Sequence, residues 1–226
     1  MLLTYLGQSA FHIKTGQYNL ILDPMISQNP LAHHIDVEAL QADYILLSHG
    51  HGDHVADAET IARRTDAKII SNFEIVTWYE KKGINGHPMN LGGKYAFDFG
   101  TVKYVVAQHS SMLPDESYGG PSGGFVVWND ERSFYYAGDT SLTLDMQLIP
   151  MTCPSLDFAI MPIGDNFTMG YEDAIIASDF VQCNKIIGCH YDTFGYIKID
   201  HDAAKKAFAD AGKQLILLNI GESIEL

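Results

Sequence analysis

The chain has 226 residues, 46% hydrophobic and 19% charged, which is typical of a folded globular protein and excludes wholesale disorder. Its 28 acidic residues against 14 basic ones give a net charge of −14, so we expect no nucleic acid or membrane partner. Three cysteines without a CxxC pair, no visible signal peptide and no apolar run of transmembrane length favour a cytoplasmic protein without a disulfide scaffold.

The first part of the chain contains short strands separated by turns, with one helical insertion. Gly7, Gly16 and Pro24 interrupt the opening meander. The strands are expected over residues 2–7, 10–15, 18–24, 44–48 and 67–71. The helices are expected over 56–65 and 73–83, the second of them closed by Gly83.

Two hairpins and then an alternation of helices and strands make up the rest. The hairpins span 94–109, turning at Gly100, and 123–139, turning near Asn129 and Asp130. The elements that follow are expected as helix 143–150, strand 157–164, helix 171–185, strand 185–190, helix 202–212 and strand 214–221. This order suits two sheets packed face to face with helices outside. A dinucleotide-binding fold fits less well, because no GxGxxG follows a strand.

The loop after the strand 44–48 reads HGHGDH and crowds four ligand-type side chains into six positions. His49 and His51 are two apart and point the same way in extended backbone. Asp53 and His54 begin the following helix and point elsewhere, so each pair can bind its own metal ion. Gly50 and Gly52 (the residues between the ligands) are expected to let the loop fold tightly.

Three further strand ends carry a ligand-type residue: His109, Asp139 and His190. Strand ends at one edge of an α/β structure are where sites are built. Imidazole and carboxylate are ligands for zinc and similar ions, so four such strand ends predict a polynuclear metal site. A purely structural zinc site is disfavoured, because those are usually cysteine-rich and this chain is large enough to fold without one.

The other five histidines are interpreted as ordinary structural residues, because they lie mid-strand, in polar loops, in a turn or at a helix start. They are His12, His33, His34, His87 and His201. Asp23 ends a strand as well. It is expected either to orient a ligand histidine or to form an Asp-Pro turn.

With these motifs in this order, the chain resembles the metallo-β-lactamase superfamily over its whole length, which implies a single domain, 1–226. More narrowly, AQHSS, AGDT and CHYDTF resemble the uncharacterised metal-dependent hydrolases close to L-ascorbate-6-phosphate lactonases. The resemblance implies an α+β, four-layer αββα sandwich of two mixed sheets. It implies one metal ion on His49, His51 and His109, a second on Asp53, His54 and His190, and Asp139 bridging them. Gln8 departs from the pattern, because related members often have histidine there.

The expected function is hydrolysis of an ester, lactone, amide or phosphoester in a small molecule, with a lactone or a phosphorylated sugar-like compound as the favoured substrate. Two divalent ions with a bridging hydroxide would carry the reaction, and Asp53 would also orient the attacking water. Nitrogen-rich ligation favours zinc, with manganese or nickel as alternatives.

Three segments after strand ends are expected to ring the site: 25–36, 110–124 and 164–170. Asn166, Thr168 and Tyr191 are expected either to donate hydrogen bonds there or to serve as ordinary turn residues. Few basic residues lie nearby, which weakens the case for a highly phosphorylated substrate.

Two other classes of protein fit the sequence less well. A di-iron redox protein is disfavoured, because His51 is not glutamate and the chain has no room for a flavin domain. A non-catalytic member of the fold is disfavoured, because all seven candidate ligands are present. The sequence leaves a homo-oligomer open.

Overall fold

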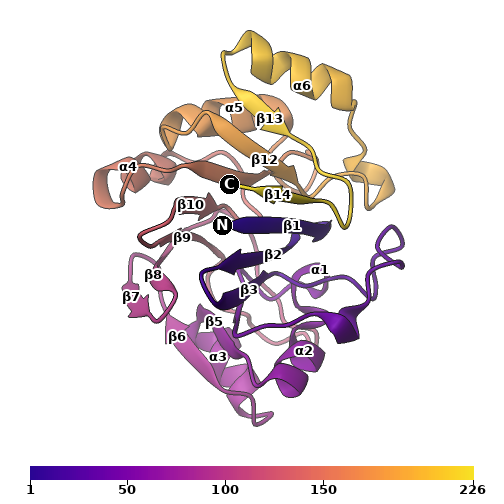
Figure 1. The fold of residues 1–226 in the computed structure, drawn as a ribbon, viewed down its shortest axis with the longest axis vertical. Helices are drawn as coiled ribbons and strands as arrows, with labels where there is room; N and C mark the ends of the chain where they lie inside the picture. The colour runs from indigo at the N-terminus through magenta and orange to yellow at the C-terminus, as the bar shows by residue number, and fades with distance from the viewer.

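A computed structural model describes the chain from Met1 to Leu226 and contains two seven-stranded sheets (Figure 1). The first sheet has the order β14 (Ser223–Glu225), β1 (Leu2–Gly7), β2 (Ala10–Thr15), β3 (Tyr18–Leu22), β4 (Tyr44–Leu46), β5 (Lys68–Asn72), β6 (Gly86–Met89). The second has the order β13 (Gln214–Ile216), β12 (Lys185–Cys189), β11 (Phe158–Pro162), β10 (Ser133–Tyr136), β9 (Gly123–Trp128), β8 (Gly100–Val106), β7 (Lys94–Phe97).

Both sheets are mixed, and each joins an antiparallel part to a parallel part. In the first sheet β14 to β3 pair antiparallel and β3 to β6 pair parallel. In the second, β7 to β10 pair antiparallel and β10 to β13 pair parallel. The antiparallel hairpins need short turns, whereas the parallel connections carry the helices, as the sequence order predicts.

Helices cover the outer face of each sheet. Those on the first sheet are α1 (Gly52–Val55), α2 (Ala58–Thr65) and α3 (Phe73–Glu80), with the 3-10 turn η1 (Val37–Ala39). Those on the second are η2 (Leu144–Leu148), α4 (Ile149–Thr152), α5 (Tyr171–Phe180) and α6 (His201–Asp210), with η3 (Gly195–Ile197) before α6. Figure 1 shows the two groups of helices on opposite sides of the molecule. None of these helices is long and apolar enough to cross a bilayer.

Three large hydrophobic cores lie between these layers, and a fourth, small cluster consists of Leu6, Ala10, Ile26 and Ala32. The central core packs the inner faces of the two sheets, with Phe11 and Leu46 from one and Phe125 and Ile160 from the other. The outer cores lie between each sheet and its helices. The predicted αββα sandwich is therefore confirmed.

Some short elements differ from the sequence-based prediction. The edge strand β6 was predicted as a turn around His87, since it contains Gly86 and Pro88. An edge strand tolerates proline, because one of its sides needs no hydrogen-bond donors. The predicted strand 214–221 ends at Ile216, and the chain then returns to form β14 beside β1. Both missed strands have few residues and weak alternation, so their periodicity carries little signal.

Candidate metal centre

The seven predicted ligands meet where four strands end. His49 and His51 follow β4, and the single-turn helix α1 carries Asp53 and His54. The other three follow the ends of β8, β10 and β12: His109, Asp139 and His190. Residues from strand ends that are 30 or more positions apart along the chain therefore converge, because both sheets present these strand ends at the same edge.

Their ligand atoms form two groups, in each of which all atoms lie within 4.8 Å of one another. One group consists of three histidines, His49, His51 and His109. The other consists of Asp53, His54, Asp139 and His190. The resemblance implied the same division for six of these residues, with Asp139 bridging the two metal ions. In the structure Asp139 belongs to the second group.

Asp139 lies between the two groups. Its Oδ2 is 3.2 Å from His54 Nε2 and 3.0 Å from His190 Nε2, both of the second group. The same oxygen is 3.7 Å from Nε2 of His109, which belongs to the first group. A carboxylate in this position is suited to contact two cations at once.

Asp23 orients His54 by a hydrogen bond to the ring nitrogen that does not face Asp139. This buried carboxylate accepts a hydrogen bond from His54 Nδ1 at 2.8 Å and another from the Tyr136 hydroxyl at 2.6 Å. It also accepts from the hydroxyl and the backbone N–H of Ser48. Because Nδ1 of His54 donates to Asp23, Nε2 is the nitrogen left on the side of Asp139, where it can bind a metal once its proton is lost. The orienting role for Asp23 is thus the alternative that the geometry favours.

Ser48 extends this arrangement to a second ligand. Its hydroxyl donates to Asp23, so its oxygen acts as acceptor for His49 Nδ1 at 3.0 Å. This fixes the proton of His49 on Nδ1 and leaves Nε2 facing His51 Nδ1 at 3.0 Å. One buried carboxylate therefore sets the tautomer of a ligand in each group.

The two groups differ in how readily their histidines lose a proton. Burial and the neighbouring His54 hold the pKa of His49 well below its usual range, and burial also lowers the pKa of His51 and His109. All three are then neutral near pH 7, which is the state in which imidazole binds a metal.

The second group carries opposite charges. Burial acts to lower the pKa of His54 and His190, but Asp139 outweighs it, raising that of His54 well above normal and that of His190 to about 9. Burial acts to raise the pKa of Asp53 and Asp139, but the charge of His54 holds both well below normal. A cation binding here competes with the protons on the two histidines.

Buried polar atoms without a hydrogen-bond partner show that the residues fit a metal. His54 Nε2 and Asp139 Oδ1 are both fully buried and lack any such partner. Buried polar atoms are normally satisfied, so unpartnered nitrogen and oxygen atoms of ligand type in one cluster fit a site that binds a cation. Nitrogen and oxygen donors of this kind are those that zinc, manganese and nickel accept.

Gln8 is a site residue whose role the sequence left undecided. It is fully buried, with a φ of 53°, and its Nε2 donates to Asp53 Oδ2 at 3.0 Å. Its backbone carbonyl accepts from the N–H of His190 at 2.8 Å. The signal in the sequence was its place at the first strand end, directly after Gly7.

The cluster forms the floor of an open pocket of about 780 Å³. The ligand candidates that line it are His51, Asp53, His109, Asp139 and His190. The remaining lining residues are Ser110, Phe167, Thr193, Phe194, Gly195 and Tyr196. They come from two of the three segments expected to ring the site and from the loop after β12.

Several predicted neighbours of the site lie elsewhere. The segment 25–36 contributes nothing to the pocket, and neither do Asn166, Thr168 or Tyr191. Asn166 and Thr168 bond within their own turn, and Tyr191 is buried against Tyr5. For these three residues the turn or packing interpretation is the one that the structure favours.

The five histidines set aside in the sequence all lie outside both groups. His12 pairs with Asn19 and His201 with Asp192. His33 and His34 contact backbone carbonyls, and His87 packs on Tyr95.

The two loop glycines have different roles, which corrects the prediction. A Cβ at Gly50 would lie 3.2 Å from the carbonyl of Met112 and 3.3 Å from Leu113, so this position needs a small residue. A Cβ at Gly52 would meet nothing within 4 Å. Gly52 lies at the exposed start of α1, where close packing does not require glycine.

Comparison with known proteins places this fold and cluster in a family. Residues 18–191 match the model of the beta-lactamase superfamily domain. UPF0173 metal-dependent hydrolases from Christiangramia forsetii and Methylacidiphilum infernorum are 58% and 51% identical over 227 residues, with 100% of each chain covered. A solved metallo hydrolase from the archaeon Ignicoccus hospitalis has a TM-score of 0.88 at 31% identity, covering 100% of this chain and 98% of that one. The chain therefore belongs to the metallo-β-lactamase superfamily and, within it, to the UPF0173 family.

Proposed function

We propose that this protein is a metal-dependent hydrolase that binds two divalent cations and cleaves an ester, lactone or phosphoester bond in a small molecule. The observation that carries the proposal is the position of Asp139 Oδ2, within 3.7 Å of histidines from both ligand groups, at the floor of an open pocket. The names of the UPF0173 relatives, metal-dependent hydrolases, agree with it.

The residues assigned to the cations are the seven of the two groups, with Asp139 shared. Cations held there would polarise the carbonyl or phosphoryl oxygen of a substrate and lower the pKa of a water molecule to about 7. Five imidazoles against two carboxylates make a nitrogen-rich set, which favours zinc over manganese or nickel.

Asp53 is the residue proposed to orient the attacking water. It lines the pocket, and its Oδ2 is held by Gln8. Because its pKa lies well below normal, it stays ionised and accepts hydrogen bonds at neutral pH. It is therefore placed to accept a hydrogen bond from the water and to position it.

The test combines metal content with a matched pair of histidine variants. We expect close to two divalent ions per chain by elemental analysis and hydrolysis of at least one member of a panel of lactones, esters and phosphodiesters. His51→Ala should abolish this hydrolysis without unfolding the protein, since His51 is half-buried at the pocket. His201→Ala should change little, because His201 is exposed and pairs with Asp192. Activity that survives in His51→Ala would exclude a catalytic metal at this group.

A further inference from the structure

Three aromatic side chains line the same pocket as the ligand groups: Phe167, Phe194 and Tyr196, called here the aromatic wall. They are 50%, 37% and 79% exposed. The rings of Phe167 and Tyr196 lie edge to face, with centroids 6.2 Å apart. Large aromatic groups gathered in solvent beside a polar cluster indicate a surface that a ligand covers.

The loop that carries Phe167 is held firmly. It joins β11 to α5 and is closed by pairing between Gly164 and Gly170. Asp165 and Asn166 both adopt left-handed backbone, with φ of 60° and 55°. Such conformations persist where the surroundings fix them, and they often lie at binding sites.

The loop that carries Phe194 and Tyr196 is anchored as well. The backbone N–H of Asp192 bonds to the carbonyl of Ile197 at 2.8 Å, and the Ile197 side chain is fully buried. The Asp192 carboxylate also accepts from the backbone N–H of Ile199. Both loops thus present their aromatic rings from fixed backbones, which lowers the entropy that a ligand must remove on binding.

The charge of the pocket limits what can bind beyond the reacting bond. No lysine or arginine lines it, and its polar residues outside the ligand groups are Ser110, Thr193 and the hydroxyl of Tyr196. A phosphate or carboxylate remote from the metal ligands would find no cation to pair with, in a protein of net charge −14. A phosphorylated sugar therefore fits this pocket poorly.

We infer, on the basis of the proposed hydrolase function, that the substrate is an uncharged ester or lactone bearing an aryl group. The ring packs against the aromatic wall while the ester carbonyl lies over Asp53 and Asp139. Stacked and edge-to-face rings attract one another beyond simple burial, and the exposed rings of Phe167 and Tyr196 are available for such a contact. Hydrolysis breaks the acyl C–O bond, and water supplies the hydroxyl of the new acid and the proton of the new alcohol.

The test compares three δ-valerolactones on the zinc-loaded protein: unsubstituted, phenyl-substituted, and carboxylate-substituted at the same ring position. We expect kcat/KM for the phenyl compound to exceed that of the other two by about tenfold. Phe194→Ala and Tyr196→Ala should each raise KM for the phenyl compound several-fold and reduce the preference for it over the unsubstituted lactone.

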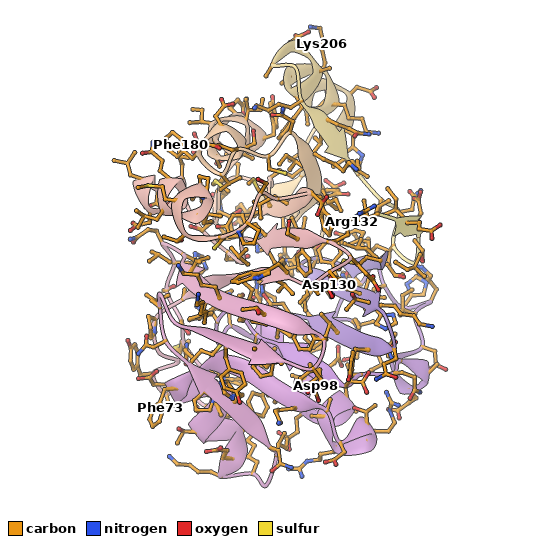
Figure 2. The ribbon with its side chains drawn as sticks, turned by 60° about the vertical axis from the view of Figure 1, so that its left-hand side comes forward. Phe73, Asp98, Asp130, Arg132, Phe180 and Lys206 are labelled. Carbon is orange, nitrogen blue, oxygen red and sulfur yellow. The ribbon has the colours of Figure 1, made fainter.

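The matched control is Phe73→Ala. Phe73 is 57% exposed, comparable with Phe167, but it lies at the start of α3 on the outside of the molecule and lines a different pocket (Figure 2). This variant should retain the wild-type preference. A preference for the carboxylate compound, or an equal loss on all three lactones in Phe194→Ala, would overturn the inference.

A binding measurement separates this inference from the proposed function. In 4-phenylcyclohexanone a ketone replaces the lactone, so the compound binds without being hydrolysed. Ligand-observed NMR should detect its binding to the wild type and to Phe73→Ala and a loss of binding in Phe194→Ala. If this pattern holds while no lactone, ester or phosphodiester is cleaved, the aromatic wall binds an aryl group and the hydrolase proposal fails. If lactones are cleaved but the ketone binds equally to all variants, the inference about the aryl group fails.

Discussion

Gln8 holds the carboxylate of Asp53 through a hydrogen bond from its Nε2 to Asp53 Oδ2, 3.0 Å long. The two residues are 45 positions apart, Gln8 in the turn between β1 and β2 and Asp53 in α1. The ionised carboxylate accepts hydrogen bonds without donating, so the amide nitrogen of Gln8 faces Asp53. Gln8 also receives the backbone N–H of His190, and thereby contacts two members of the second ligand group.

Replacing Gln8 by methionine should weaken metal binding at the second group. Methionine has a similar length but no N–H, so Asp53 loses the contact that fixes its oxygen. Losing a partner behind a metal ligand typically lowers affinity by about 10- to 100-fold. Zinc titration against a chelating indicator measures this affinity. The fold should persist, because the backbone bond to His190 remains.

Gln8→His is the matched variant, since an imidazole N–H can still donate to Asp53. We expect it to recover most of the zinc affinity lost in Gln8→Met. If both variants bind zinc as tightly as the wild type, the hydrogen bond to Asp53 has no part in holding the metal.

Asp23→Asn should destabilise the protein strongly. Asp23 is fully buried and accepts from His54, Ser48 and Tyr136, and an amide can satisfy these donors only in part. Asparagine tolerates the φ of 38°, so the change tests the hydrogen bonds and not the backbone. The cost should be about 2–4 kcal/mol in the free energy of unfolding, measured with urea.

Tyr136→Phe provides the comparison for Asp23→Asn. It removes the hydroxyl bonded to Asp23 and to the carbonyl of Ser9 but leaves the ring in the core. We expect a loss of about 1 kcal/mol and an unchanged zinc affinity, because His54 keeps its partner. An Asp23→Asn protein as stable as Tyr136→Phe would contradict the central position assigned to Asp23.

The sequence predicted the layered fold and the seven clustered residues for a physical reason. Each of these residues follows an apolar run that forms a strand. Strand ends meet at one edge of a sheet, and their position does not depend on the conformation of the loops. Gln8 could not be assigned in this way, because its contact with Asp53 depends on a left-handed backbone at one residue.

Loop side chains were harder to predict than strand ends. Asn166 and Phe167 are neighbours, yet Phe167 lines the pocket and Asn166 bonds within its own turn. The difference comes from two consecutive left-handed residues, Asp165 and Asn166, which reverse the direction of the chain. No periodicity in the sequence reports such a reversal.

Chelator-treated protein should lose stability between pH 6.5 and pH 9. The folded protein raises the pKa of His190 from 6.5 to about 9, so the stabilisation is complete below pH 6.5 and is lost as the pH rises through 9. The loss from His190 alone should be about 3 kcal/mol in the free energy of unfolding, and His54, whose pKa is also raised well above normal, adds to it in the same direction. Asp53 and Asp139 stay ionised throughout this range, since their pKa values lie well below normal.

Saturating zinc should remove this pH dependence, because a metal-bound histidine carries no proton to lose. Urea unfolding at pH 6.5 and pH 9, with and without zinc, gives the comparison. Equal stability of the chelator-treated protein at both pH values would show that Asp139 does not hold a proton on His190.

Two glycines near the ligands should respond in opposite ways to alanine. Gly138 precedes Asp139 and has a φ of 62°. A Cβ added at Gly138 would lie 2.7 Å from Ser48 Cβ and 2.8 Å from the carbonyl of Gly123. Gly138→Ala should therefore cost at least about 2 kcal/mol and weaken zinc binding by displacing Asp139. Gly52→Ala should be neutral or stabilising by up to about 1 kcal/mol, because a Cβ there meets nothing and the residue begins α1. Thermal unfolding and zinc titration of both variants measure the difference. If Gly52→Ala lowered the zinc affinity as much as Gly138→Ala, the steric explanation would fail. The loop 49–54 would then need Gly52 for its backbone flexibility.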